Sequence, residues 1–148
     1  MATEGLDFGA QVDAWVNETE ARMLAVAKES TQRLVSQIQT GPIGHVPVDT
    51  GFCRASVRAS LDAMPPIDPN FKGKKGETYP YDPGDITATI SNLQLGQTIY
   101  VGWTAAYAGV LEYGHSQQAP SGFVRVNCAM WPEIVAEVTA EAKGIAGQ

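Results

Sequence analysis

The side chains best suited to catalysis are the chain's two histidines, His45 and His115. A histidine that drives hydrolysis needs a nucleophile and an orienting acid beside it. Two such sets can be written from the sequence: His45 with Asp49 and Ser56, and His115 with Glu112 and Ser116. Neither has the spacing of a known hydrolase family, and turns explain the small residues in both. We therefore expect no enzyme activity, and a small hydrolase ranks third among three interpretations.

Metal and cofactor sites have equally little support in the sequence. Cys53 and Cys128 are the only cysteines, and with the two histidines they offer one potential set of zinc ligands. Zinc sites usually contain at least one close pair of ligands, which this set lacks. The sequence also has neither a Walker-type phosphate loop nor a dinucleotide fingerprint. It thus predicts no metal and no cofactor, and the two cysteines are expected as thiols rather than a disulfide.

Composition and charge narrow the classes of protein further. The chain of 148 residues is 44% hydrophobic and 18% charged, which predicts one globular domain over 1–148. Its net charge of −6 argues against coating nucleic acid, so DNA is expected at most to pass through a channel without specific binding. No stretch approaches the roughly 20 apolar residues of a membrane span, and residues 1–5 do not resemble a secretory signal. We expect folding in the cytoplasm and no membrane partner.

The first third of the chain predicts one long helix from Asp7 to Thr40. Its apolar stripe advances in steps of three and four, as one helical face requires: Phe8, Val12, Trp15, Thr19, Met23, Val26, Ser30, Leu34 and Ile38. Asp7 is the expected N-cap, and Gly41-Pro42 ends the helix with a left-handed glycine. At roughly 50 Å this helix exceeds the roughly 40 Å diameter of a compact domain of this size. We therefore expect an unpartnered stretch that includes Val26, Leu34 and Ile38; a break near Ser30 is the alternative.

The middle of the chain predicts a small antiparallel sheet and a long loop. Asp49, Thr50 and Gly51 form a tight turn in which Asp49 should bond to its own backbone. A strand near 54–62 follows, since apolar and polar residues alternate there, and it should pair with a strand near 98–102. The segment 64–85 is rich in Pro and Gly, so we expect it to order only against a neighbour. Its possible partner residues are Phe71, Lys72, Lys74, Lys75, Tyr79 and Tyr81, with nucleic-acid contact as a minor alternative.

The remaining elements complete an α+β fold. Short helices are predicted near 85–94, with Asp85 as the N-cap, and near 105–113, stopped by Gly114. Residues 121–143 predict a helix kinked at Pro132, because periodicity of three and four persists over this whole segment. A strand through Val124, Val126 and Cys128 is the alternative.

Two segments carry a resemblance to a known family. The first is Pro47-Val48-Asp49-Thr50-Gly51-Phe52-Cys53-Arg54-Ala55-Ser56; the second combines Thr98-Ile99-Tyr100-Val101-Gly102, Ala106-Tyr107-Ala108, Leu111-Glu112-Tyr113-Gly114, Ser116-Gln117-Gln118-Ala119-Pro120 and Gly122-Phe123-Val124-Arg125. In this order they resemble the head–tail joining and tail-completion proteins of long-tailed bacteriophages, a group that includes neck, tail-terminator and minor tail protein Z-like members. The resemblance covers roughly residues 7–140, including the long N-terminal helix and the last helix.

This resemblance implies a structural virion protein of the neck or tail, present in the host cytoplasm during assembly. It also implies a self-associating ring, which we expect to be six-fold and head-to-tail, and contacts with neighbouring neck and tail-tube proteins. A non-viral or prophage-derived binding module without catalysis is the alternative. The candidate interface or motif residues are Arg54, Trp103, Tyr107, Glu112, Tyr113, Gly114, Gln118, Pro120 and Phe123.

Their types suggest physical roles for several of these residues. Arg54, on the polar face of the predicted strand, needs an anion, and Glu112 is the expected partner. Trp103, Tyr107 and Tyr113 are amphipathic side chains of the kind enriched in interfaces, with packing in the domain's own core as the alternative.

Overall fold

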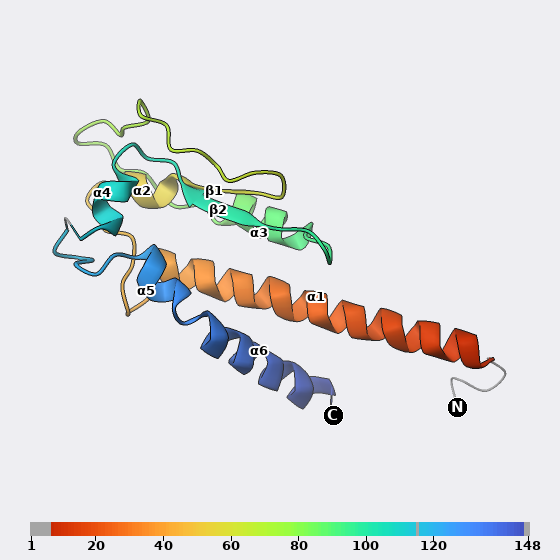
Figure 1. Cartoon of the computed structure of the whole chain (residues 1–148). Helices are drawn as coiled ribbons and strands as arrows, with labels where there is room; N and C mark the ends of the chain where they lie inside the picture. The colour runs from red at the N-terminus through yellow and green to blue at the C-terminus, as the bar shows by residue number, and fades with distance from the viewer. Residues whose placement is uncertain (1–6, 115, 147–148) are drawn as a thin grey trace.

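The computed structural model describes residues 7–114 and 116–146 and confirms a mixed α+β fold (Figure 1). The elements follow one another as α1 (Phe8–Thr40), α2 (Phe52–Ala55), β1 (Val57–Ser60), α3 (Gly84–Ser91), β2 (Tyr100–Trp103), α4 (Ala108–Glu112), α5 (Val124–Cys128) and α6 (Trp131–Ala146). The sheet and α3 lie on one side of α1, and α6 lies on the other (Figure 1).

Helix α1 runs unbroken over 33 residues, so the alternative of a break near Ser30 is wrong. Asp7 caps it as predicted, since its Oδ1 accepts the N–H of Ala10 at 2.6 Å. The expected left-handed cap at Gly41 is wrong, because φ there is −78°. A glycine is still required, since a Cβ at this position would lie 2.5 Å from the Gln37 carbonyl oxygen. The following proline cannot continue the helix.

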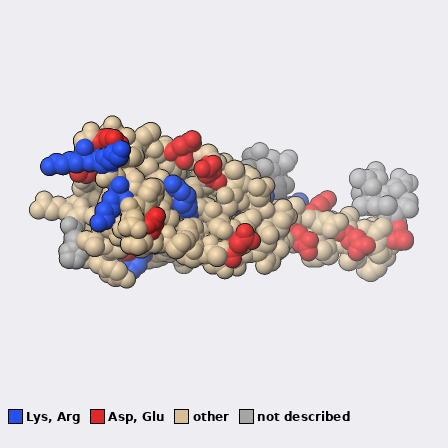
Figure 2. All heavy atoms as spheres, turned by 90° about the horizontal axis from the view of Figure 1, so that it is seen from above, with Lys and Arg blue, Asp and Glu red and all other residues tan. Residues whose placement is uncertain are grey.

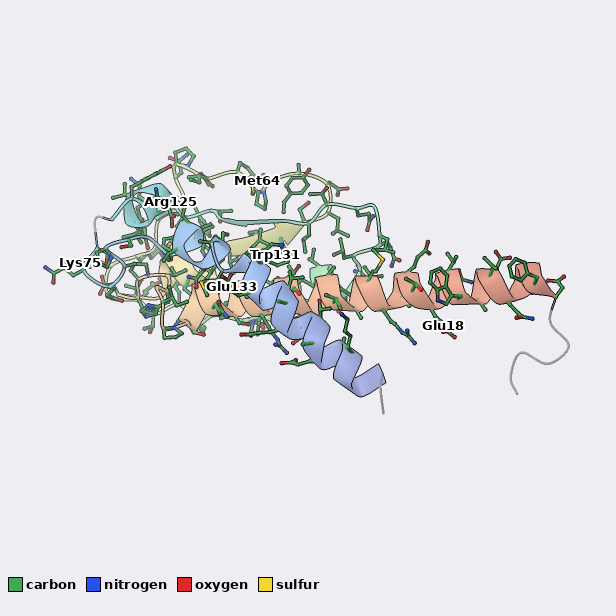
Figure 3. The ribbon with its side chains drawn as sticks, turned by 60° about the horizontal axis from the view of Figure 1, so that its bottom comes forward. Glu18, Met64, Lys75, Arg125, Trp131 and Glu133 are labelled. Carbon is green, nitrogen blue, oxygen red and sulfur yellow. The ribbon has the colours of Figure 1, made fainter. Side chains whose placement is uncertain are left out.

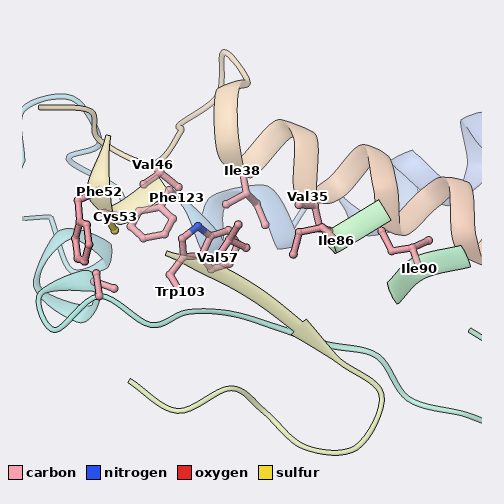
Figure 4. Packing of buried hydrophobic residues seen from close by; sticks show 12 residues of the cluster. Val35, Ile38, Val46, Phe52, Cys53, Val57, Ile86, Ile90, Trp103 and Phe123 are labelled. Atoms are coloured by element: carbon pink, nitrogen blue, oxygen red, sulfur yellow. The ribbon is translucent and has the colours of Figure 1, made fainter. Parts of the chain in front are cut away.

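The core gathers around the C-terminal half of α1. Val35 and Ile38 are almost fully buried, and Ile86 of α3 packs with them (Figure 4). Trp103 of β2 and Phe123, just before α5, close the same cluster with an edge-to-face contact at 5.7 Å between ring centroids. Arg33, two residues before Val35 on α1, donates two hydrogen bonds to Glu141 of α6 and so joins the last helix to the first.

The predicted antiparallel pairing of the two strands is confirmed, with Val57 opposite Trp103 and Ser60 opposite Tyr100. The first strand is shorter than the predicted 54–62, because the chain forms one helical turn, α2, before it. The N–H of Ala55 bonds to the carbonyl of Gly51 at 2.9 Å, which closes that turn. The prediction that Arg54 lies on the strand's polar face is therefore wrong, since Arg54 belongs to α2.

The long segment 64–85 packs on its own domain, so the expectation that it orders only against a neighbour is wrong. Backbone hydrogen bonds join Asp68 to Thr104, Ala106 to Phe71 and Tyr79 to Thr50 at 2.8–3.0 Å. The rings of Phe71 and Tyr79 meet Phe52 edge-on at 4.7 and 4.9 Å. These aromatic residues, with Tyr81, pack against the core, whereas Lys72, Lys74 and Lys75 stay exposed.

Two of the three remaining predicted helices are present with shifted ends, and the predicted kinked helix over 121–143 is instead divided into two helices. Helix α3 begins with Gly84, whose N–H bonds to Asp82 at 2.9 Å, so Asp85 is not its cap. Helix α4 begins at Ala108 rather than near 105. The C-terminal segment is two helices, and Pro132 stands in the first turn of α6, where its missing N–H costs no hydrogen bond. The strand alternative there is wrong.

Candidate functional site

The two motif segments found in the sequence meet at the end of the molecule that carries α2 and α4 (Figure 1). The side chain of Gln118 joins them. Its Oε1 accepts the backbone N–H of Val48 at 2.8 Å, and its Nε2 donates to the carbonyl of Val48 at 2.9 Å. One amide side chain thus satisfies both backbone groups of a residue 70 positions away and holds the loop before α5 against the Asp49-Thr50-Gly51 turn.

The Asp49-Thr50-Gly51 turn is built around its glycine. Gly51 has φ of 84°, a conformation that side chains with a Cβ rarely adopt. A Cβ there would also lie 2.5 Å from the carbonyl oxygen of Tyr79. The expected hydrogen bond from Asp49 to its own turn is wrong, because Thr50 takes that role: its Oγ1 accepts the N–H of Phe52 at 3.3 Å. The Asp49 carboxylate is exposed.

Glu112 connects α4 to α5. Its carboxylate accepts the backbone N–H groups of Phe123, Val124 and Arg125 at 2.8–3.0 Å, and the Arg125 guanidinium donates to it at 2.8 Å. The predicted Arg54–Glu112 ion pair is therefore wrong. Burial alone would raise the pKa of Glu112, but the backbone hydrogen bonds and then the Arg125 side chain outweigh burial and hold this pKa below its ordinary value. The carboxylate is a fixed anion that caps α5.

The other motif positions shape the same loop. Gly114 ends α4, and a Cβ on it would lie 2.5 Å from the carbonyl oxygen of Pro120. A Cβ on Gly122 would meet the carbonyl oxygen of Glu112. Gly114 and Gly122 therefore stand where the backbone of this loop passes close to the carbonyl groups of Pro120 and Glu112, so that a side chain would not fit.

The motif aromatic residues divide into core and surface. Trp103 and Phe123 are buried, so the interpretation of Trp103 as an interface anchor is wrong. Tyr107 is half-buried, with its ring 6.3 Å from that of Phe52. Tyr113 is 69% exposed, and the Arg125 guanidinium lies 4.6 Å from its ring centre. Tyr113 is therefore the motif aromatic that offers the most surface to a partner.

Sequence reasoning missed Gln39 and Arg125. Gln39 is fully buried near the end of α1, where it accepts from the Trp103 indole at 2.8 Å and donates to the Arg54 carbonyl at 2.9 Å. The detectable signal was its position four residues after Val35, which places it on the buried face of α1. Arg125 gave no signal beyond belonging to the motif.

A cavity of about 290 Å³ lies between the Asp49-Thr50-Gly51 turn and α4, and Cys53 and Ser116 are among the residues in its wall. Burial raises the pKa of the Cys53 thiol to about 12, so the reactive thiolate is not populated at neutral pH. Ser56, proposed in one catalytic set, is buried and donates to the Cys53 carbonyl at 2.6 Å. His115, the base of the other set, lies outside the described residues.

A second candidate surface is the N-terminal part of α1 together with its N-cap, residues 7–23, which projects beyond the rest of the domain (Figure 2). We call this part the arm. Phe8 is 81% exposed, Trp15 is 66% exposed and Met23 is 58% exposed, and Val12 and Val16 are also open to solvent. The expectation that Leu34 and Ile38 belong to the unpartnered stretch is wrong, since Ile38 is buried and Leu34 packs against the core. The exposed stripe lies at the opposite end of the helix.

Among residues 7–114 and 116–146, no three histidine, cysteine or acidic side chains are grouped so as to hold a metal ion. Within the same residues, no helix has the length and apolar character needed to cross a membrane. Comparison of the chain with protein-family models, with curated proteins and with solved structures gives no match.

Proposed function

We propose that this protein is a structural component of a tailed-phage particle, acting in head–tail joining or in tail completion and termination. The observation that carries the proposal is the arm, which holds a row of large apolar side chains in solvent. A soluble protein with such a row usually presents it to another protein. The proposed partners are further copies of the chain in a six-fold ring and the adjoining neck and tail-tube proteins.

The motif residues support this proposal because their role is to fix the positions of backbone segments. Gln118, Glu112 and Gly51 hold backbone segments in fixed positions and leave no reactive group free among them. A ring subunit needs such a fixed shape, because its surface must match identical neighbours. The sequence resemblance to phage neck and tail proteins rests on these same positions.

The net charge of −6 suits a ring through which DNA passes without being held. An acidic protein has little general attraction for the DNA backbone.

The test is a phage that carries Trp15→Glu in the gene for this chain. We expect DNA-filled heads and unattached tails by electron microscopy, with infectivity reduced by orders of magnitude, because a charge on the arm prevents docking. The matched control is Trp131→Glu, an exposed tryptophan on α6 that lies outside the arm. Joined, infectious particles that contain none of this protein would contradict the proposal.

A binding module outside a virion is the second candidate, since an exposed apolar arm also suits a soluble partner. Gene neighbourhood separates the two candidates. Portal, capsid and tail-tube genes on either side of this gene favour the phage particle, and their absence favours the binding module.

A further inference from the structure

The arm is acidic, and three lysines lie on the loop at the far end of the molecule. The arm holds Asp7, Asp13, Glu18 and Glu20 against a single Arg22. The far end carries Lys72, Lys74 and Lys75 on the loop, and none of these lysines forms an ion pair with a described residue. Figure 2 shows acidic side chains along the projecting helix and a mixture of basic and acidic side chains at the other end, and Figure 3 labels Glu18 on the arm and Lys75 at the far end.

The lysine end is also hollowed. A groove of about 730 Å³ runs between the Asp49-Thr50-Gly51 turn and the loop, with Thr50, Lys74, Lys75 and Tyr107 among its walls. We call it the loop groove. Tyr107 and Thr50 also line the neighbouring cavity, where Phe52 and Leu111 add apolar surface. The groove and the neighbouring cavity together therefore place lysines beside aromatic and apolar side chains.

Two carboxylates, those of Asp49 and Glu77, lie beside these lysines. Glu77 accepts a hydrogen bond from the Tyr79 hydroxyl at 2.9 Å, which directs part of its charge toward its own loop. The groove wall thus holds two lysines and two carboxylates, and Lys72, which precedes Gly73 of the wall in the chain, adds a third cation nearby.

We propose that the arm of one copy docks into the loop groove of a second copy of this chain. This inference rests on the self-association in the proposed function and names the two surfaces that meet. Pairing two arms would bring their carboxylates together. Pairing an arm with a loop groove instead brings the carboxylates of the arm to the lysines of the groove and covers the apolar stripe of the arm. The arm of one copy thus has a chemically matched site on the next.

The size of the arm suits this contact. Residues 7–23 of a helix extend over roughly 25 Å. Each of the side chains of Phe8 and Trp15 contributes about 150–250 Å² of buried surface if it is fully covered. A standard interface buries roughly 800 Å² on each partner, so these two rings supply a substantial part of that area. Because the two surfaces differ, successive contacts run head to tail and can close into a ring.

The experiment is a charge exchange read by light scattering and sedimentation over a range of protein concentrations. The arm variant is Glu18→Lys with Glu20→Lys, the groove variant is Lys74→Glu with Lys75→Glu, and a third chain carries all four changes. The control is Glu133→Lys with Glu137→Lys, the same change of charge on an exposed part of α6. All positions are exposed, so circular dichroism should report an unchanged fold.

We expect the arm variant and the groove variant each to weaken association by about tenfold or more, and the fourfold variant to regain most of it. Association of the natural chain should also weaken between about 0.1 M and 1 M salt, where the Debye length falls from about 10 Å to about 3 Å. The control should associate as the natural chain does.

The inference is overturned if the natural chain associates but the arm and groove variants associate equally well. A fourfold variant that stays as weak as the double variants also overturns it, since the charges would then act on separate partners. A natural chain that is monomeric at every concentration overturns the contact as well. None of these results decides whether the protein belongs to a phage particle, which the Trp15→Glu phage tests separately.

Discussion

The side chain of Gln118 pairs with the backbone of Val48 as a neighbouring β-strand would, donating to its carbonyl and accepting from its N–H. This pairing joins two motifs that lie far apart in the sequence. Since the Val48 backbone immediately precedes the Asp49-Thr50-Gly51 turn, the amide of Gln118 sets where that turn begins.

Replacing Gln118 with Ala should lower the free energy of unfolding by about 0.5–1.5 kcal/mol, because two hydrogen bonds are lost at an exposed position. Urea unfolding measures this loss, and amide exchange of Val48 should become faster. Gln117→Ala is the matched control, since Gln117 is exposed and forms none of these bonds. Equal stability of the two variants would mean that the pairing does not hold the motifs together.

Replacing Gly51 with Ala should destabilise the fold by about 1–3 kcal/mol from backbone strain alone, and by more from the clash with the Tyr79 carbonyl. Gly76→Ala separates these two causes, because Gly76 has φ of 85° but nothing within 4 Å of an added Cβ. Calorimetry should show the larger loss for Gly51→Ala. A larger loss for Gly76→Ala would contradict the close approach of the loop to the turn.

The Glu112 carboxylate should make stability depend on pH. Its pKa is lower in the folded protein than in the unfolded chain, so the folded state binds fewer protons. The stabilisation is complete above the ordinary glutamate pKa, about 4.3, and is lost as pH falls through the folded-state value. Glu112→Gln should therefore lower stability at pH 7 and flatten the fall in stability on acidification. Glu133→Gln, an exposed carboxylate on α6, should retain the steep fall.

The two cysteines should differ in their reactivity toward a thiol reagent. Cys53 is buried, and burial raises the pKa of its thiol to about 12, whereas Cys128 is exposed. We expect mass spectrometry of the folded protein to find label on Cys128 and almost none on Cys53, with both labelled after unfolding. Rapid labelling of Cys53 in the folded protein would instead indicate an accessible nucleophile and would revive an enzymatic interpretation.

The helices were the most predictable part of the fold, because their signals are local. The stripe from Phe8 to Ile38 and the cap at Asp7 act within a few residues of each other, and the structure has both. The order of α1, the β1–β2 pair, α3 and α4 also followed from periodicity and turns. The predicted strand is too long at its start because the alternation of apolar and polar residues cannot distinguish a strand from the short helical turn at Arg54 and Ala55.

The contacts within the site were less predictable, because they depend on tertiary packing. Arg54 and Glu112 have opposite charges, yet the Glu112 carboxylate binds the start of α5 and Arg125 instead. The buried role of Gln39 likewise depends on where Trp103 lies, which no local pattern determines. Which end of α1 stays exposed depended on the placement of α3 and α6, since these helices pack against its later turns.

The arm should be the least protected part of α1. A helix in water without tertiary partners is marginal, so the arm depends on the later turns to hold its shape. Native-state hydrogen exchange should find amides of residues 12–22 exchanging at least about a hundredfold faster than those of residues 31–39, where Val35 and Ile38 are buried.

At concentrations where the chain associates, exchange of the same arm amides should become slower, because docking covers the apolar stripe and disfavours local opening of the helix. The arm variant Glu18→Lys with Glu20→Lys is the control, and its arm should exchange rapidly at every concentration. Arm amides that are strongly protected in the dilute natural chain would mean that the arm packs on its own domain, contrary to the exposure of Phe8 and Trp15.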